Sequence, residues 1–435
     1  MKCYMVSLGC AKNQVDSEMI LGLVKRKMEI VSEVYDADIV ICNTCAFIES
    51  ARKEAVDTIF NLKENMKPDA KLIVCGCLAQ RYKAELEKIM PEVNRFIAIE
   101  EYSNLAKILN DVCNSKFDFD DKLSPLNKVV STPNYMRYIK ISEGCLNRCA
   151  FCAIPLIRGN LVSRTIEDIT EEVRKEVMDG AYEINLISQD TTKYGYDIYK
   201  ELKIVDLLKS LIAIPYDFKI RLLYLYPDIV TDELLELMAS SNKIMHYFDI
   251  PIQHSENKIL KKMLRRGSRE YMLDLFKKIK TMMPDAIFRT TFIVGFPYED
   301  DADFENLLKF VEDVKFDRLG AFTFSLEEGT PATKYPNEIS ESLKQKRYEA
   351  LMDLQSNISR ELNCNKIGMT LDDCFIIGYD EESYMYLARN YMFAPDDIDG
   401  VIYVAAKDEL ELGQRIKVKV LDADEYTLTG EQIVE

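Results

Sequence analysis

Short apolar runs alternate with amphipathic stretches along most of this chain, and the alternation limits its fold more than any other feature. Within residues 1–113 the runs CYMVSL, ADIVICN and KLIVCG have the composition of buried parallel strands, and a stretch of helical periodicity follows each of them. Such repeats predict a doubly wound α/β domain. Residues 114–134 have no clear period and contain Pro, Asn and Asp, so we interpret them as a linker.

The alternation resumes in the segment 135–360. The strand-like runs there are YIKI, EINLIS, KIRLLYL, YFDIPI, IFRTTFIVG and RLGAFTFS. Six strand-like runs with helical stretches between them predict a parallel (β/α) barrel, or a partial one, with its site at the carboxyl ends of the strands. From residue 367 to 435 the pattern changes to short β segments, which predict a small antiparallel β-barrel.

Composition narrows the class of protein. The 435 residues are 48% hydrophobic, enough for two or three domains with their own cores. We see no leader segment and no apolar run long enough to span a membrane, and therefore expect a cytoplasmic protein without membrane contact. Its 12 cysteines are then reduced thiols or metal ligands. Only two histidines are present, which leaves little for a His-based metal site or a Ser–His triad.

The negative charge is concentrated at the carboxyl end. Residues 367–435 contain 16 Asp and Glu against five Lys and Arg, a net of −11 out of −17 for the whole chain. Nucleic-acid binding depends on Lys and Arg that neutralise phosphates, so this tail makes RNA binding unfavourable and suits a basic protein. The alternative is that the acidity only keeps the protein soluble.

Three cysteines share one short loop. Cys145, Cys149 and Cys152 stand in ISEGCLNRCAFCAIP with the spacing C-x3-C-x2-C. Zinc sites usually take four ligands from paired CxxC units. Three thiolates from one loop instead favour a cubane iron–sulfur cluster with one iron open to a small molecule. A zinc knuckle, or three unrelated core cysteines, is the alternative.

A second set of three cysteines lies in the first domain. Cys10, Cys45 and Cys77 each follow a predicted strand and precede a predicted helix. The carboxyl ends of parallel strands meet at one edge of a sheet, and a helix amino terminus favours the thiolate, so these three are candidate ligands of another cluster. The alternative is that they are buried structural cysteines, which are common in proteins. Cys42 and Cys75 fall inside apolar runs and are expected to face the core.

These residues resemble a known family. GCLNRCAFCAIPLIRGNLVSR is similar to the signature of the radical S-adenosylmethionine methylthiotransferases, and SLGCAKNQVDSE, NTCAFIESA and CGCLAQRY resemble the cysteine loops of their amino-terminal domain. The carboxyl-terminal β segment resembles their TRAM domain in position and length. The resemblance implies two 4Fe-4S clusters, a radical-generating one on Cys145, Cys149 and Cys152 that binds S-adenosylmethionine, and an auxiliary one on Cys10, Cys45 and Cys77 that carries sulfur.

The branches of this family differ in substrate. ISQDTTKYG, DIPIQHSENKILKKMLRRG and FSLEEGTPA resemble the branch that modifies an aspartate of small-subunit ribosomal protein twelve. The resemblance therefore implies a methylthiotransferase for the β-carbon of that aspartate, with a basic ribosomal protein as substrate and a flavodoxin-like or ferredoxin-like electron donor. The alternative within the family is a tRNA adenosine methylthiotransferase.

Three further residues are candidates for cofactor contact. Gln189 lies just beyond a predicted barrel strand, on the side where the site is expected, although it could equally cap a loop. Arg289 and Thr291 stand within a strand-like run, where a polar side chain that points into the barrel indicates a site.

Overall fold

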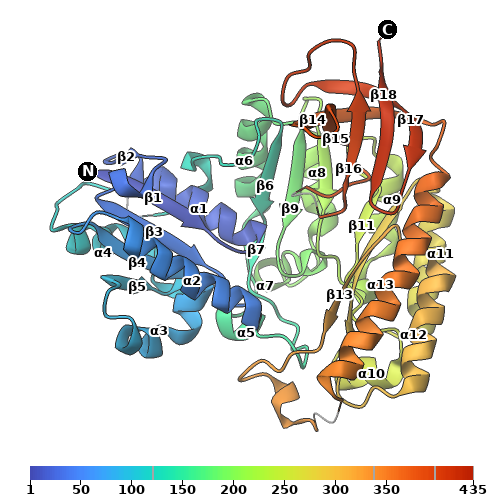
Figure 1. Ribbon diagram of the computed structural model, residues 1–435, viewed down its shortest axis with the longest axis horizontal. Helices are drawn as coiled ribbons and strands as arrows, with labels where there is room; N and C mark the ends of the chain where they lie inside the picture. The colour runs from blue at the N-terminus through green and yellow to red at the C-terminus, as the bar shows by residue number, and fades with distance from the viewer. Residues whose placement is uncertain (120–121, 337–338, 396–397, 435) are drawn as a thin grey trace.

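The computed structural model describes residues 1–119, 122–336, 339–395 and 398–434. Residues 120–121 of the predicted linker, 337–338 of the predicted barrel segment, and 396–397 and 435 of the acidic tail lie outside the described residues. Figure 1 shows an amino-terminal α/β domain, a central barrel of strands and helices, and a small β-barrel at the carboxyl end. The predicted fold class is confirmed in all three parts.

The first domain is a parallel sheet in the order β2-β1-β3-β4-β5. Its strands are β1 (Lys2–Ser7), β2 (Glu29–Ile30), β3 (Ile39–Thr44), β4 (Lys71–Gly76) and β5 (Arg95–Ile97). The crossover helices are α1 (Ala11–Val24), α2 (Glu49–Asn65), α3 (Cys77–Ile89) and α4 (Leu105–Cys113). They cover both faces, α2 and α3 packing on one core and α1 and α4 on the other. The order reverses between β1 and β3, and ligands bind at such a reversal in open α/β sheets.

The central domain is a barrel of six parallel strands that does not close. Two three-stranded sheets, β10-β9-β6 and β11-β12-β13, meet through an isolated bridge between Ile220 and Ile244. The strands are β6 (Met136–Lys140), β9 (Glu183–Ile187), β10 (Lys219–Leu222), β11 (Tyr247–Asp249), β12 (Ile287–Val294) and β13 (Arg318–Thr323). The main helices are α6 (Ile166–Met178), α8 (Ile204–Ile212), α9 (Asp232–Ser240), α11 (Arg269–Met282), α12 (Asp301–Val314) and α13 (Glu341–Cys364). No pairing joins β6 to β13 among the described strands, so the barrel is partial.

The loop between β6 and α6 carries short elements of its own. They are β7 (Ser142–Glu143), α5 (Ile154–Ile157) and β8 (Val162–Ser163), and β7 pairs with β8. This loop lies beside the first domain in Figure 1, where α5 packs close to α3. The segment with three closely spaced cysteines is therefore held between the two domains.

The carboxyl-terminal domain is a closed barrel in the order β14-β15-β16-β18-β17. Its strands are β14 (Thr370–Asp380), β15 (Met385–Arg389), β16 (Val401–Ala405), β17 (Arg415–Ala423) and β18 (Thr427–Ile433). The neighbours pair in antiparallel fashion, as predicted, except that β16 and β18 run parallel. Inward residues alternate with less buried ones along β16 and β17, which is the period of two in the sequence. β14 instead buries three residues in succession, Cys374 to Ile376, beside the shifts in its pairing register.

This small barrel covers the amino-terminal ends of the central strands. Tyr135, just before β6, stacks on Phe375 of β14 with 4.8 Å between ring centroids. Below this contact, Glu183 at the start of β9 pairs with Arg221 of β10 at 3.0 Å and with Arg389 of β15 at 2.8 Å. All three charged side chains are buried, so the two barrels share an ion-paired core. The opposite, carboxyl-terminal mouth is left for a ligand.

No helix in the described part of the chain has the length and apolar character needed to cross a membrane.

Candidate active site

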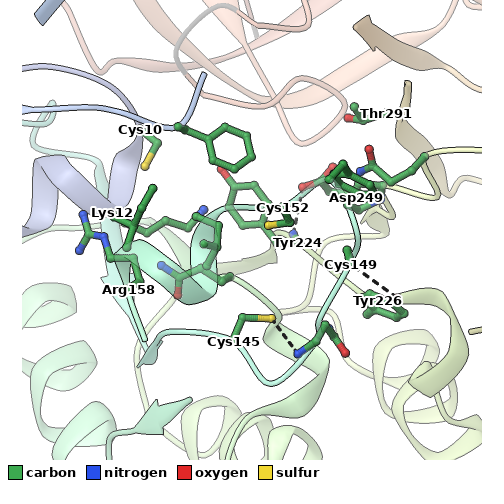
Figure 2. Close-up of a pocket in the computed structure, with 18 of the residues that line it drawn as sticks. Cys10, Lys12, Cys145, Cys149, Cys152, Arg158, Tyr224, Tyr226, Asp249 and Thr291 are labelled. Carbon is green, nitrogen blue, oxygen red and sulfur yellow. Dashed lines mark hydrogen bonds between the residues drawn. The ribbon is translucent and has the colours of Figure 1, made fainter. Parts of the chain in front are cut away.

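All six candidate cysteines line one cavity of about 380 Å³ between the first domain and the carboxyl-terminal mouth of the barrel (Figure 2). Cys10 directly precedes α1, Cys45 directly follows β3, and Cys77 is the first residue of α3. The other three, Cys145, Cys149 and Cys152, lie between β7 and α5. Cys42 and Cys75 are buried in the sheet, as expected, and do not line the cavity.

Glycine allows the loops of the first domain to come together. Gly9 has φ +88°, and a Cβ there would lie 2.7 Å from Cys45 Cβ and 3.0 Å from its sulfur. Gly76 has φ +90°, and a Cβ there would lie 2.2 Å from the side-chain oxygen of Asn43. Any larger residue would be strained in this backbone region and would also collide with a neighbouring strand or thiol. The glycine before Cys10 therefore brings the Cys10 and Cys45 loops into contact.

The loop of Cys145, Cys149 and Cys152 is fixed by its own backbone. The Cys145 amide donates to the Gly159 carbonyl at 3.1 Å, and the Cys152 amide donates to the Cys149 carbonyl at 3.1 Å. The amide of Ala150 donates to Met263 on the barrel at 2.9 Å. These bonds anchor both ends and the middle of the loop to its own flank and to the barrel.

Burial favours the protonated form of Cys152 and Cys77. Burial raises the pKa of Cys152 to about 12. Burial also raises the pKa of Cys77 to about 11, although the Arg158 guanidinium, 3.3 Å from its sulfur, works in the opposite direction. The pKa of Cys10 is lowered instead: burial acts to raise it, but the Lys12 ammonium and backbone amides outweigh that effect. Metal ligation by cysteine requires the thiolate, so cluster assembly here releases protons.

The donor set fits iron–sulfur clusters better than a single metal ion. Among the described residues no group of three His, Cys, Asp or Glu side chains converges closely enough to hold one ion. A cubane cluster spreads its irons over a cube, so its cysteine ligands stand further apart than those of a single ion. Thiolates are the ligands that such clusters take, so the six thiols on this cavity wall fit iron–sulfur ligation in kind.

A network of buried ion pairs links the first domain to the segment that contains Cys145, Cys149 and Cys152. Arg158 pairs with Asp16 of α1 at 2.7 Å and with Glu143 of β7 at 3.0 Å, and Lys140 of β6 pairs with the same two carboxylates. Burial works to raise the pKa of Glu143, but the charges of Lys140 and Arg158 lower it to about 2. The network therefore fixes the distance between the two cysteine sets.

The three predicted cofactor contacts all line the cavity, with different partners. Gln189 donates to Glu143 at 2.9 Å, while its side-chain oxygen is buried without a hydrogen bond among the described residues. Arg289 pairs with Asp249 at 3.1 Å and with Asp399 of the small barrel at 3.2 Å. Thr291 stands one layer further toward the mouth on the same strand (Figure 2). Gln189 and Thr291 have free capacity for a ligand, whereas Arg289 is already paired.

Sequence reasoning missed several residues on the cavity wall. Lys12 and Tyr224 meet there, the Lys12 ammonium lying 3.2 Å from the centroid of the Tyr224 ring. Asp249, the last residue of β11, accepts the Tyr224 amide at 2.9 Å. Asp249 and Tyr224 carried a usable signal, because each stands at the carboxyl end of a barrel strand. Nothing in the sequence pairs Lys12 with a residue 212 positions away.

The comparison with protein families divides the chain into three matches. Residues 2–98 match a family described as "Uncharacterized protein family UPF0004". Residues 139–311 match the radical SAM superfamily, and residues 367–433 match the TRAM domain. The chain is thus a radical S-adenosylmethionine protein, a class whose cofactors are an iron–sulfur cluster and S-adenosylmethionine.

Relatives match the chain over its full length. The ribosomal protein uS12 methylthiotransferase RimO of Clostridioides difficile is 43% identical, and the alignment covers 100% of this chain and 99% of that protein. The protein of the same name from Caldicellulosiruptor saccharolyticus is 45% identical, with 98% and 99% covered. The chain belongs to the RimO family. Since RimO proteins from these two organisms match from end to end, the three parts of the fold occur together in the relatives.

Solved structures support the fold of this RimO-family chain. The radical S-adenosylmethionine methyltransferase TsrM from Kitasatospora setae superposes with a TM-score of 0.58 at 12% identity, covering 76% of each chain. The cobalamin-dependent S-adenosylmethionine radical enzyme OxsB superposes with a TM-score of 0.52 at 13% identity, covering 82% of this chain and 56% of that one. At these identities the likeness concerns the fold alone.

Proposed function

We propose that the protein replaces a hydrogen on the β-carbon of an aspartate in ribosomal protein uS12 with a methylthio group. The observation that carries the proposal is the convergence of two separate three-cysteine sets on one cavity. One cluster with an open iron suffices to generate a radical, so the second set needs another task, and sulfur delivery is the task that the family resemblance implies. The RimO relatives, named for uS12, support this substrate.

Each cysteine set would hold one cluster. Cys145, Cys149 and Cys152 would ligate the radical-generating 4Fe-4S cluster, and Cys10, Cys45 and Cys77 the auxiliary one. When bound, the clusters and S-adenosylmethionine supply the radical, the methyl group and the sulfur. The chain supplies position: the Arg158 network links the two sets through Asp16 of α1 and Glu143 of β7.

Two further residues are proposed as contacts to S-adenosylmethionine. The free side-chain oxygen of Gln189 is buried on the cavity wall and needs a donor, which an amino or hydroxyl group would provide. Thr291 offers a hydroxyl from the next strand layer. Arg289 would act indirectly, because it pairs with Asp249 on the cavity wall and is itself held by Asp399.

The outer surface of the small barrel is suited to a basic substrate. Among the residues that the structure describes, nine acidic side chains are exposed there: Asp372, Glu381, Glu382, Asp408, Glu409, Glu411, Asp422, Asp424 and Glu431. Clustered charge of one sign accelerates encounter with a partner of the other sign. We propose that this surface attracts uS12, and that a flavodoxin-like or ferredoxin-like protein supplies electrons.

Mass spectrometry of uS12 tests the proposed function. In cells that contain the gene, one aspartate of uS12 is expected to carry a methylthio group in place of a hydrogen, and in cells without the gene the same aspartate is expected to be unmodified. An unmodified uS12 in both strains contradicts the proposal.

The tRNA alternative makes a different prediction. An enzyme for anticodon adenosine would bind tRNA tightly at physiological salt, which requires a basic surface. The acidic small barrel gives no such surface, and the uS12-named relatives do not support the alternative. A gel-shift assay is expected to show no submicromolar tRNA binding.

A further inference from the structure

Lys12 is a buried cation in the cavity, between the two cysteine sets. It is the second residue of α1 and stands two positions after Cys10. Its side chain crosses from the first domain toward the barrel, where the ammonium lies over the ring of Tyr224 (Figure 2). Only 8% of Lys12 is exposed, although it lines a cavity large enough for a ligand.

No carboxylate among the described residues pairs with Lys12. The aromatic face of Tyr224 attracts the ammonium but accepts no proper hydrogen bond and carries no net charge. Lysine is rarely buried to this degree without an anionic partner, because loss of water disfavours the charge. A buried cation that is aimed into a cavity and has no carboxylate partner among the described residues indicates a site for an anion.

The other cations on the cavity wall have partners of their own. They are Arg158, Arg265 and Arg289. Arg158 and Arg289 form ion pairs with buried carboxylates at 2.7 and 3.1 Å. Arg265 donates to the Pro251 carbonyl at 2.6 Å. It also lies 3.7 Å from Cys149 Sγ, so it faces the loop of Cys145, Cys149 and Cys152. Among the cavity cations in the described part of the chain, Lys12 is therefore the one with neither an ion pair nor a hydrogen-bond acceptor.

We propose that Lys12 binds the side-chain carboxylate of the target aspartate. This inference rests on the proposed function and deepens it by naming the group that recognises the substrate. The carboxylate of aspartate is bonded directly to the β-carbon. Holding it at Lys12, beside Cys10 and across the cavity from the loop of Cys145, places the β-carbon between the two cysteine sets. Lys12 is a positioning and specificity residue, while Tyr224 holds its ammonium in place.

Two molecules could bring a carboxylate to this site: the target aspartate and the methionine part of S-adenosylmethionine. The two sources are separable, because the affinity for each can be measured independently on the same enzyme. Our inference assigns the site to the target. It therefore predicts that a change at Lys12 alters the affinity for uS12 and leaves the affinity for S-adenosylmethionine unchanged.

The test uses the full chain with reconstituted clusters, purified uS12 and the variant Lys12→Met. The variant keeps the length of the side chain and removes its charge. The dissociation constant for uS12 is expected to rise about tenfold to a hundredfold, as for the loss of a hydrogen bond between charged groups. The control is Lys53→Met, which removes the same charge from an exposed position on α2.

The sign of the expected effect separates local from general electrostatics. Removing a positive charge from the enzyme strengthens its overall attraction for a basic protein. A loss of affinity in Lys12→Met, absent in Lys53→Met, therefore reports a local contact. Lys12→Arg, which keeps a cation, is expected to retain most of the affinity. Iron content and the visible spectrum confirm that each variant carries its clusters.

A substrate variant completes the test. Replacement of the target aspartate of uS12 by asparagine is expected to weaken binding to the wild-type enzyme and to cause little further loss with Lys12→Met, since both changes remove the same contact. Additive losses, an unchanged affinity of Lys12→Met for uS12, or a selective loss of S-adenosylmethionine binding would each overturn the inference. If the wild-type enzyme leaves uS12 unmodified, the proposed function itself fails, which is a separate result.

Discussion

The two mouths of the central barrel both contain charged side chains, but these side chains are paired in a core at one mouth and face a cavity at the other. At the amino-terminal mouth, Glu183 pairs with Arg221 and with Arg389 of the small barrel inside a shared core. At the carboxyl-terminal mouth, Lys12 and six thiols face a cavity. The first arrangement stabilises the fold, and the second leaves capacity for ligands. Changes at the two mouths should therefore affect different properties.

The largest expected effect is a difference between the two cysteine sets at the carboxyl-terminal mouth. Cys145→Ala removes a ligand of the radical-generating cluster and is expected to abolish both S-adenosylmethionine cleavage and uS12 modification. Cys45→Ala is expected to abolish modification while cleavage to 5′-deoxyadenosine continues. Chromatography of the nucleoside and mass spectrometry of uS12 measure the two activities. Equal loss of cleavage in both variants would contradict separate roles for the two sets.

The amino-terminal mouth should respond in stability rather than activity. Arg389→Met removes one partner of the buried Glu183 and is expected to lower the free energy of unfolding by about 3 kcal/mol. Arg415→Met is the matched control, because its ion pair with Asp217 is exposed and worth about 0–1 kcal/mol. Urea denaturation measures both. A loss of activity per folded molecule in Arg389→Met would contradict the claim that the amino-terminal mouth contributes to stability and not to activity.

Two glycine-to-alanine variants test whether the close contact at Gly9 is needed to bring Cys10, Cys45 and Cys77 together. Gly9→Ala places a Cβ against Cys45 in a strained backbone region, so we expect loss of the auxiliary cluster, about half of the bound iron. Gly368→Ala, outside the cavity lining and just before β14, has a similar positive φ of +86°, and its added Cβ would meet no atom within 4 Å. Its iron content should stay near that of the wild type. Equal iron in the two variants would show that the Gly9 contact is unimportant.

The smallest effect concerns pH. Burial acts to raise the pKa of Glu183, but Arg389 and Arg221 hold it below the ordinary value of 4.5. Its contribution to stability is therefore fully present above pH 4.5 and is lost as the pH falls through the lowered pKa. Denaturation midpoints should decrease below pH 4.5 in the wild type and change less in Glu183→Gln. A parallel decrease in both would assign the acid sensitivity to other groups.

Residues close together in sequence were the easiest to predict. The spacing of Cys145, Cys149 and Cys152 is a local property, and the structure fixes that loop largely by its own hydrogen bonds. Cys10 and Cys45 could be brought together in advance because parallel strands end at a common sheet edge. The order of the strands, with its reversal between β1 and β3, then placed both at the usual ligand site.

Contacts between distant segments could not be read from the sequence. The meeting of Lys12 with Tyr224 depends on how the first domain docks on the barrel, which no periodicity encodes. Arg289 was expected to face a cofactor because inward residues alternate along a strand. The alternation was a sound guide to direction, but the partner, Asp399, comes from the small barrel. The parallel pairing of β16 with β18 likewise depends on closure of the whole barrel.

Iron and acid-labile sulfide in the anaerobically reconstituted protein test the central claim most directly, namely that one cavity serves two cluster-binding sets. The account predicts about eight irons and about eight sulfides per chain, and about half of each when Cys10, Cys45 and Cys77 are all replaced by alanine. About four irons in the wild type, or one zinc without sulfide, would contradict it.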